Sequence, residues 1–298
     1  MAPSAGLALL PPLLLTFRLA GAVEVPGYQD KYPPLPGTER GSPESLVRNF
    51  EHVFEDELLE AMDELARGSG ALRNSKRVTF WLGRERAPRC AIERAAKVLE
   101  KFTFPRGAAA HGIVGVKYWV QRRTTEENVN FHYDKDEGLA SDQQVMRPPP
   151  LVGVTHLENW GAPTLVLNQT TIHNGNVDAP TVPTSGWLIL PKRNKHALHR
   201  GDLHHGAPHD MAAVPVPPGK HRHTLVTSWE IEKPLEPNCH LIPDRELQTA
   251  LTGKVSASKT DVPAPPLSSD PGRLLWPERA PAALCAVGVL QRAQPRRR

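Results

Sequence analysis

The chain has few cysteines and no apolar run long enough to cross a bilayer. Its 298 residues include only Cys90, Cys239 and Cys285. Three cysteines this far apart predict neither a disulfide framework nor a zinc ribbon, and we interpret them as ordinary reduced thiols. The apolar segment 5–15 is too short for a membrane span, and no later segment is long enough. We therefore expect neither a disulfide scaffold nor a membrane-spanning protein.

The sequence also lacks the charge pattern of a nucleic-acid-binding protein. The net charge is only +4 with a pI near 9.0, and the last three residues, all arginine, supply much of the excess. No basic stripe interleaved with aromatic residues and no recognition-helix pattern is present. Nucleic acid is therefore not an expected partner.

The N-terminal segment leaves the localisation open between two alternatives. Residues 5–15 are apolar and Ala20-Gly21-Ala22 is similar to a signal-peptide cleavage site, which would place the chain in the secretory pathway. Against this, no lysine or arginine precedes the apolar run, Pro11 and Pro12 interrupt it, and Arg18 follows it. Without cleavage the chain would be cytoplasmic. The sequon at Asn168 matters only in the first case.

Proline is abundant and divides the chain into three regions. The 31 prolines are about twice the average share for a chain of this length. They are concentrated at the two ends. We predict a signal-like apolar start and proline-rich arm over 1–41, one folded domain over 42–245 and a disordered tail over 246–298.

The first part of the domain, 42–105, is predicted to be helical support. Ser42 can cap a helix and Pro43 suits its first turn. An apolar stripe follows at a spacing of three or four residues and ends at Gly68; its members are Leu46, Phe50, Val53, Phe54, Leu58, Met62 and Leu65. A strand is expected over 77–82 and a second helix over 91–102.

The second part, 110–235, is predicted to be β-structure. After Gly112 no helical period survives, and short β-rich runs alternate with turn residues. These runs cover 114–122, 128–134, 151–157, 164–167, 186–190 and 224–231. Together with the two helices they predict a mainly β, α+β fold: a double-stranded β-helix, or jelly roll, supported by helices on one sheet.

The residues 128–134 contain an H-x-D triplet on a predicted strand. Because side chains alternate across a strand, His132 and Asp134 share one face with Asn130, while the residues between them anchor the other face in the core. An imidazole and a carboxylate two residues apart can bind a divalent metal at adjacent positions. Alone, such a triplet is common by chance.

A second segment strengthens this interpretation. Residues 198–208 read LHRGDLHHGAP, and a histidine at the end of a strand could join the first pair. Three ligands on one octahedral face leave three positions open, which is typical of non-haem iron(II) oxygenases. Downstream, Arg222 and Thr224 share one face of the next predicted strand, and a guanidinium beside a hydroxyl suits a carboxylate ligand.

These motifs resemble a known family. FHYDKDEG, GAPTLVL, GDLHHGAP and RHTLVTSWEIEKP occur in the order expected of 2-oxoglutarate and iron(II)-dependent oxygenases, near the prolyl-hydroxylase-like branch. The resemblance covers residues 110–235. It implies a jelly roll in which His132, Asp134 and one later histidine bind iron.

The resemblance also implies a cosubstrate site. The distal carboxylate of 2-oxoglutarate is expected on Arg222 and Thr224. Tyr118 is a further candidate for this pocket, with Gln121 as its alternative, because neighbours of odd separation face opposite sides. Of the adjacent His204 and His205, we choose His205 as the metal ligand, since it directly precedes Gly206.

Other polar residues near these motifs receive simpler interpretations. We expect five further histidines to lie at the surface, where they could bind zinc or nickel adventitiously; they are His196, His199, His209, His221 and His223. Asp136 and Glu137 are possible substitutes for the ligand carboxylate, and Asp136 is expected at the rim beyond the strand end.

The predicted function is that of a dioxygenase using iron(II), 2-oxoglutarate and dioxygen, with ascorbate as a further candidate cofactor. It would hydroxylate a protein side chain, such as that of proline, or a small molecule, releasing succinate and CO2. The loops 136–150 and 168–185 would select the substrate. The alternatives are a non-catalytic metal-binding jelly roll and a zinc hydrolase, although the sequence has no H-E-x-x-H helix. Oligomeric state is not predicted.

Overall fold

The computed structural model describes residues 35–36, 46–68, 79–170, 183, 185–235, 239–240 and 273–275. Most of the predicted arm and tail therefore lies outside the described residues, as do Ser42 and Pro43. Within the described part of the chain, no helix is both long and apolar enough to cross a membrane.

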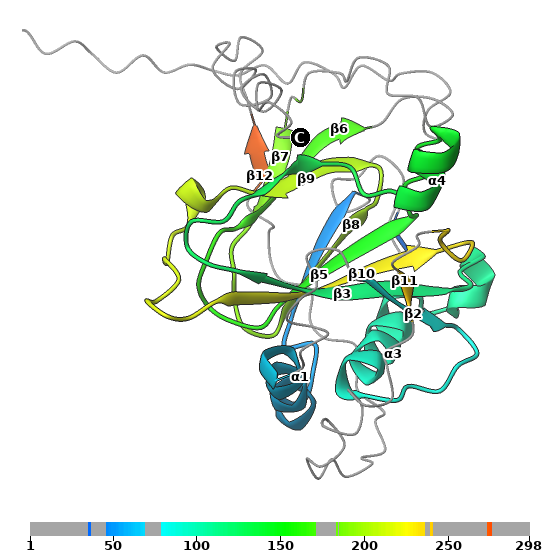
Figure 1. Ribbon diagram of the computed structural model, residues 1–298, viewed down its shortest axis with the longest axis horizontal. Helices are drawn as coiled ribbons and strands as arrows, with labels where there is room; N and C mark the ends of the chain where they lie inside the picture. Colours follow the sequence, from blue (N-terminus) through cyan, green and yellow to red (C-terminus); the bar gives the residue numbers. More distant parts are fainter. Residues whose placement is uncertain are drawn as a thin grey trace, which may run out of the picture.

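Two sheets packed face to face form the body of the domain (Figure 1). The larger sheet has the strand order β1-β8-β5-β10-β3-β2-β11, and the smaller has the order β12-β7-β6-β9-β4. The strands are β1 (Val47–Glu51), β2 (Thr79–Gly83), β3 (Gly115–Arg123), β4 (Val129–His132), β5 (Leu151–His156), β6 (Thr164–Thr170), β7 (Ser185–Ile189), β8 (Lys195–Arg200), β9 (Leu203–Ala207), β10 (Arg222–Glu230), β11 (Cys239–His240) and β12 (Arg273–Leu275).

The path from β3 to β10 makes the fold a jelly roll. Strands β3, β5, β8 and β10 lie in the larger sheet, whereas β4, β6, β7 and β9 lie in the smaller one. Neighbouring strands within each of these sets of four are antiparallel. The predicted double-stranded β-helix is thus confirmed.

The register of the larger sheet defines which side chains face the interior. Ala197 of β8 packs with Val166 and Trp187 of the smaller sheet, so its side chain lies between the sheets. Ala197 is paired with Val154, which is paired in turn with Val226 of β10. Since side chains alternate along a strand, every second residue of β10, from Arg222 to Glu230, faces the interior.

Two helices cover the outer face of the larger sheet (Figure 1). These are α1 (Asp56–Gly68) and α3 (Ala91–Thr103). Met62 and Leu99 belong to one apolar cluster with Leu225 and Trp229, which point outward from β10. The remaining helical segments are α4 (Glu137–Gln143) and the short 3-10 turns η2 (Ala108–His111) and η3 (His209–Met211).

The long first helix predicted from Ser42 is wrong in its first half. Residues 47–51 form strand β1, which pairs with the edge of β8. Val47 packs in the cluster between the sheets, and Phe50 packs on Phe102 of α3. A strand here forms backbone hydrogen bonds with the edge of β8. The local periodicity of the sequence cannot reveal such a pairing. His52, with φ of 54°, follows the strand, and the helix begins only at Asp56.

The remaining predicted elements differ from the structure mainly in extent. The helix over 91–102 and the strands over 151–157 and 224–231 correspond to α3, β5 and β10. Several elements were not predicted. Strand β8 is rich in histidine and basic residues, which hides its period, and α4 lies in the segment predicted as the loop 136–150. The short strands β11 and β12 were not predicted either, and β12 lies within the segment predicted as a disordered tail.

Candidate metal centre

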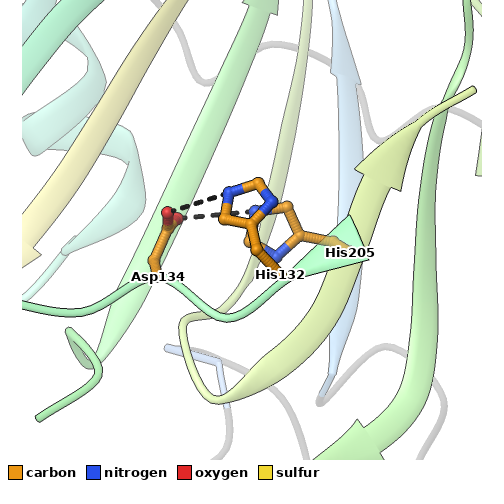
Figure 2. Close-up of side chains that lie close together, drawn as sticks. All are labelled: His132, Asp134 and His205. Carbon is orange, nitrogen blue, oxygen red and sulfur yellow. Dashed lines mark ion pairs between the residues drawn. The ribbon is translucent and has the colours of Figure 1, made fainter. Parts of the chain in front are cut away.

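Strands β4 and β9 bring the three predicted metal ligands together (Figure 2). His132 ends β4 and is paired in register with His205 of β9, while Asp134 lies two residues beyond the end of β4. One ligand atom from each of the three residues lies within 4.8 Å of the others. The His132 Nε2–Asp134 Oδ1 and His205 Nε2–Asp134 Oδ2 distances are both 3.5 Å.

Backbone carbonyls orient both imidazoles for metal binding. His132 Nδ1 lies 2.7 Å from the carbonyl oxygen of Asn130, and His205 Nδ1 lies 2.9 Å from that of Leu203. A carbonyl oxygen can only accept, so each Nδ1 carries the proton and donates it. In the neutral ring, Nε2 is then left with a free lone pair, and in both rings Nε2 is the atom nearest Asp134.

The electrostatics of the site favour a cation. Burial alone would raise the pKa of Asp134, but His205, His132 and Lys117 hold that pKa well below its usual range. Burial lowers the pKa of His132, yet its hydrogen bond and charge interaction with Asp134 leave that pKa raised overall. Burial leaves the pKa of His205 lowered. An ionised carboxylate thus faces two imidazoles, one of which burial keeps neutral.

The donor set fits a divalent metal ion. Asp134 Oδ2 is buried and has no hydrogen-bond partner among the described residues, and a metal ion would satisfy it. Two imidazole nitrogens and one carboxylate oxygen are the ligand set of non-haem iron(II) sites with open positions. Adjacent ligands about 2.1 Å from an octahedral ion are about 3 Å apart, so only a small movement is needed.

His204 points away from this site. Its ring stacks on Tyr133 at a centroid distance of 4.6 Å and lies 5.5 Å from that of Phe131. Its Nδ1 lies 2.9 Å from Gln169 Oε1. The structure therefore brings His205, and not His204, to Asp134, as the alternation of side chains along β9 requires.

The expectation that five nearby histidines lie at the surface is wrong for three of them. His196 and His199 have no exposed surface, and His223 is buried. His196 bonds to Thr155 on the helix-covered side of β8. The His199 ring lies 4.7 Å from that of His205, on the interior side. Buried histidines were missed because the strand that carries two of them, β8, was not predicted.

The two alternative carboxylates do not join the metal site. Asp136 caps α4 by accepting from the Leu139 backbone N–H and pairs with Arg147 at 2.8 Å. The side chain of Glu137 is 69% exposed and lies 3.6 Å from Lys135. Asp134 is the carboxylate that the fold directs to the histidines.

Arg222 and Thr224, the predicted cosubstrate residues, both face the interior. Arg222 is only 3% exposed; its guanidinium donates to the carbonyl of Ala162, and its Nε has no partner among the described residues. Burial lowers the pKa of Arg222 to about 10, which still leaves it charged at neutral pH. The Thr224 hydroxyl is buried and likewise without a partner there.

His156 is a functional candidate that the sequence did not reveal. It lies opposite Thr224 in the register of β5 and β10, and neither of its ring nitrogens has a partner among the described residues. Complete burial, with Arg222 nearby, holds its pKa well below the usual value, so the ring is neutral. His156 is identified by the pairing of β5 with β10, and this pairing cannot be predicted from a local sequence pattern.

Tyr118 is wrongly predicted as a cosubstrate residue. Its hydroxyl donates to Glu93 of α3 at 2.9 Å, within the packing between β3 and the helices. Burial and the charge of Glu93 raise the pKa of Tyr118 well above its usual value. Gln121, the alternative, lies opposite Thr224 and so faces the interior.

Comparison with known proteins gives matches to solved structures only. No model of a protein family and no curated protein matches the chain. A prolyl-4-hydroxylase from Pseudomonas putida is 14% identical, with a TM-score of 0.38, over 64% of this chain and 87% of that one. A 2OG-Fe(II) oxygenase family protein from Burkholderia pseudomallei is 13% identical, with a TM-score of 0.34, over 63% and 84%. A viral collagen prolyl hydroxylase from Paramecium bursaria Chlorella virus-1 is 14% identical, with a TM-score of 0.35, over 63% and 91%. Matches this distant carry no weight for the activity.

Proposed function

We propose that the protein is an iron(II)- and 2-oxoglutarate-dependent dioxygenase that hydroxylates a protein side chain, such as that of proline, or a small molecule. The observation that carries the proposal is that ligand atoms of His132, Asp134 and His205 lie within 4.8 Å of one another, while the Nδ1 atoms of both histidines are held by backbone carbonyls. The same interior holds a buried guanidinium and a hydroxyl suited to the cosubstrate.

The protein's own residues would bind, orient and shield the reactants. His132, Asp134 and His205 would hold the iron on one face and leave other positions open. The bound iron, with 2-oxoglutarate, supplies the oxidative chemistry. Arg222 would bind the distal carboxylate of 2-oxoglutarate, Thr224 would donate a hydrogen bond to it, and neutral His156 could donate another. Because these three side chains are buried, they would keep the bound carboxylate away from bulk water.

The two rival functions explain less of the structure. A metal-binding protein without activity would have no use for a buried guanidinium at Arg222, which is costly to bury without an anion. A zinc hydrolase would need a carboxylate or histidine as general base beside the metal. Asp136 and Glu137, which follow the H-x-D triplet, cap α4 and point to solvent, respectively. The buried His199, whose ring lies 4.7 Å from that of His205, is a candidate base, but a hydrolase would leave the buried guanidinium of Arg222 without a use.

The proposal is tested by cosubstrate turnover. Loaded with iron(II) without oxygen and then exposed to air, the protein should consume 2-oxoglutarate and release succinate, even in slow uncoupled turnover. His132→Ala and Asp134→Ala should abolish this release, whereas His204→Ala, which removes an imidazole that faces away, should retain it. Succinate release at the wild-type rate by His132→Ala or Asp134→Ala would refute the site assignment.

A further inference from the structure

A third imidazole lies beside the metal centre, on the sheet that faces the ligand strands. His199 of β8 has no exposed surface, and its ring centroid lies 4.7 Å from that of His205 on β9. His199 is two residues from Ala197, so both side chains face the interior. The charges of His205, Asp134 and His132 all act on this ring. His199 thus lies within electrostatic range of all three candidate ligands.

The two ring nitrogens of His199 differ in their hydrogen bonding. Nδ1 lies 2.8 Å from the carbonyl oxygen of Arg200, which can only accept, so Nδ1 carries the proton. Nε2 is buried and has no hydrogen-bond partner among the described residues. Burial lowers the pKa of His199 to about 3, so the ring is neutral at pH 7 and Nε2 keeps its lone pair. A buried acceptor left without a donor destabilises a protein, so this nitrogen calls for a ligand that donates.

The three metal ligands cannot be that donor. His132 and His205 both donate their Nδ1 protons to backbone carbonyls, and their Nε2 atoms carry lone pairs. Asp134 is ionised, because the neighbouring positive charges hold its pKa well below the usual range, and it has no proton to donate. His199 therefore adds a fourth acceptor to a group of three.

The polar side chains of the larger sheet at the same level are bonded elsewhere. His199, Ser228 and Lys117 lie in one row across this sheet, which the pairing of β8, β5, β10 and β3 defines. The Ser228 hydroxyl donates to Glu230 at 2.8 Å, and the Lys117 ammonium donates to the carbonyl oxygen of Lys135 at 3.4 Å. The donor that would satisfy His199 is therefore a ligand that enters this interior.

Water bound to the metal has the required chemistry. The three ligands leave other positions of an octahedral ion open. His199 does not belong to the group whose ligand atoms lie within 4.8 Å of one another among the described residues, so its nitrogen lies outside that ligand set. A cation draws electron density from the oxygen of a bound water, which makes this water a stronger hydrogen-bond donor than a free one.

We propose that His199 is a positioning residue of the metal centre, whose Nε2 accepts a hydrogen bond from a water molecule coordinated on the side that faces the larger sheet. The inference rests on the metal site of the proposed function, but not on 2-oxoglutarate. Its consequence is selectivity at one open position. A ligand with a proton to donate is favoured there, whereas a carboxylate or ketone oxygen would place two acceptors against each other.

The test is manganese(II) binding by the full chain, measured by calorimetry. His199→Phe keeps a ring and removes the acceptor, so it should weaken metal binding about 10–100-fold, as the loss of an outer-shell partner does. His199→Gln offers its Oε1 as an acceptor and should recover most of the affinity. The control is the double variant Thr155→Val, His196→Phe, which removes an equally buried imidazole from the opposite face of β8. It should bind the metal as the wild type does.

Pulsed electron paramagnetic resonance of the manganese(II) protein gives a readout that a purely structural role would not change. Spectra in H2O and D2O identify the exchangeable protons of the coordinated water. Their coupling should be the same in the wild type and His199→Gln and different in His199→Phe. Equal couplings and equal metal affinities in all three proteins would overturn the inference. A direct bond between manganese and the His199 nitrogen, seen as a strong nitrogen coupling that His199→Phe loses, would overturn it too.

The outcomes separate this inference from the proposed function. Succinate release by the wild type, together with unchanged metal affinity in His199→Phe, would refute the inference alone. Metal binding that depends on His199 in a protein that releases no succinate would refute the dioxygenase and keep the inference. A wild type that binds no metal would refute both. Melting temperatures of the metal-free variants show that they are folded, and His199→Leu replaces His199→Phe if the larger ring is not tolerated.

Discussion

His204 and His205 are adjacent in the chain but differ completely in their surroundings. His205 has its Nδ1 fixed by a carbonyl and its Nε2 near Asp134, whereas His204 is stacked on Tyr133. His205→Ala should weaken iron(II) or cobalt(II) binding by more than about 100-fold, since losing only an outer-shell partner of a ligand costs about 10–100-fold. His204→Ala should change it little. Calorimetry without oxygen measures both, and equal losses would mean that the metal lies elsewhere.

The pKa of His132 predicts how metal binding depends on pH. Asp134 raises that pKa above its usual value, so the metal-free protein holds a proton on His132 that the metal must displace. Metal affinity should therefore rise with pH, by up to about tenfold per pH unit, until the pH exceeds the raised pKa. Titrations between pH 5.5 and 8 in buffers of different ionisation enthalpy would measure the affinity and the released proton. A flat profile over this range would contradict the assignment.

At the scale of elements, local sequence patterns predicted individual strands and helices. The β-rich runs 151–157 and 224–231 predicted β5 and β10, and His132 of the H-x-D triplet lies on β4, although the strand ends there and Asp134 lies two residues beyond it. Pairing between distant strands was not predictable. Because β1 exists only as a partner of β8, its apolar spacing was interpreted as part of a helix. The position of His156 opposite Thr224 likewise depends on the register of β10 with β5.

Strand β1 should contribute to stability through one side chain above all. Phe50 is 4% exposed and packs on Phe102 and His196. Phe50→Ala should lower the free energy of unfolding by about 3–5 kcal/mol, through lost burial and the cavity left behind. Urea unfolding followed by circular dichroism measures this. The neighbouring Glu51→Ala removes partly exposed ion pairs with Lys192 and Lys195 and should cost less than about 1 kcal/mol. A similar loss of stability in both variants would contradict the observed packing of Phe50 on α3.

At the scale of the whole molecule, the domain is stabilised by packing around buried imidazoles. His156 and His196 are fully buried on opposite faces of the larger sheet. Burial holds the pKa of His156 well below its usual value and lowers that of His196 to about 3. The folded protein therefore keeps both rings neutral in a pH range where the unfolded chain binds protons. Acid therefore lowers the free energy of unfolding.

The metal-free protein should therefore lose stability as the pH falls below about 6.5, the usual pKa of histidine. Below that value the unfolded state binds more protons than the folded state, so the free energy of unfolding decreases by about 1.4 kcal/mol per pH unit for each such histidine. For His196 this decrease continues down to its folded pKa of about 3. His132, with its raised pKa, acts in the opposite direction: its contribution to stability grows as the pH falls towards 6.5 and is constant below it, so it does not change the slope at lower pH.

Urea unfolding at pH 7.0, 6.0 and 5.0 would measure this slope directly. The double variant Thr155→Val, His196→Phe removes both members of one buried hydrogen bond and with them one titrating group. Its slope should be smaller than that of the wild type by about 1.4 kcal/mol per pH unit. Thr155→Val alone keeps the imidazole and so should keep the slope, whatever it does to stability at neutral pH. An unchanged slope in the double variant would show that His196 is accessible to protons in the folded protein, and that the helices α1 and α3 do not seal the outer face of the larger sheet.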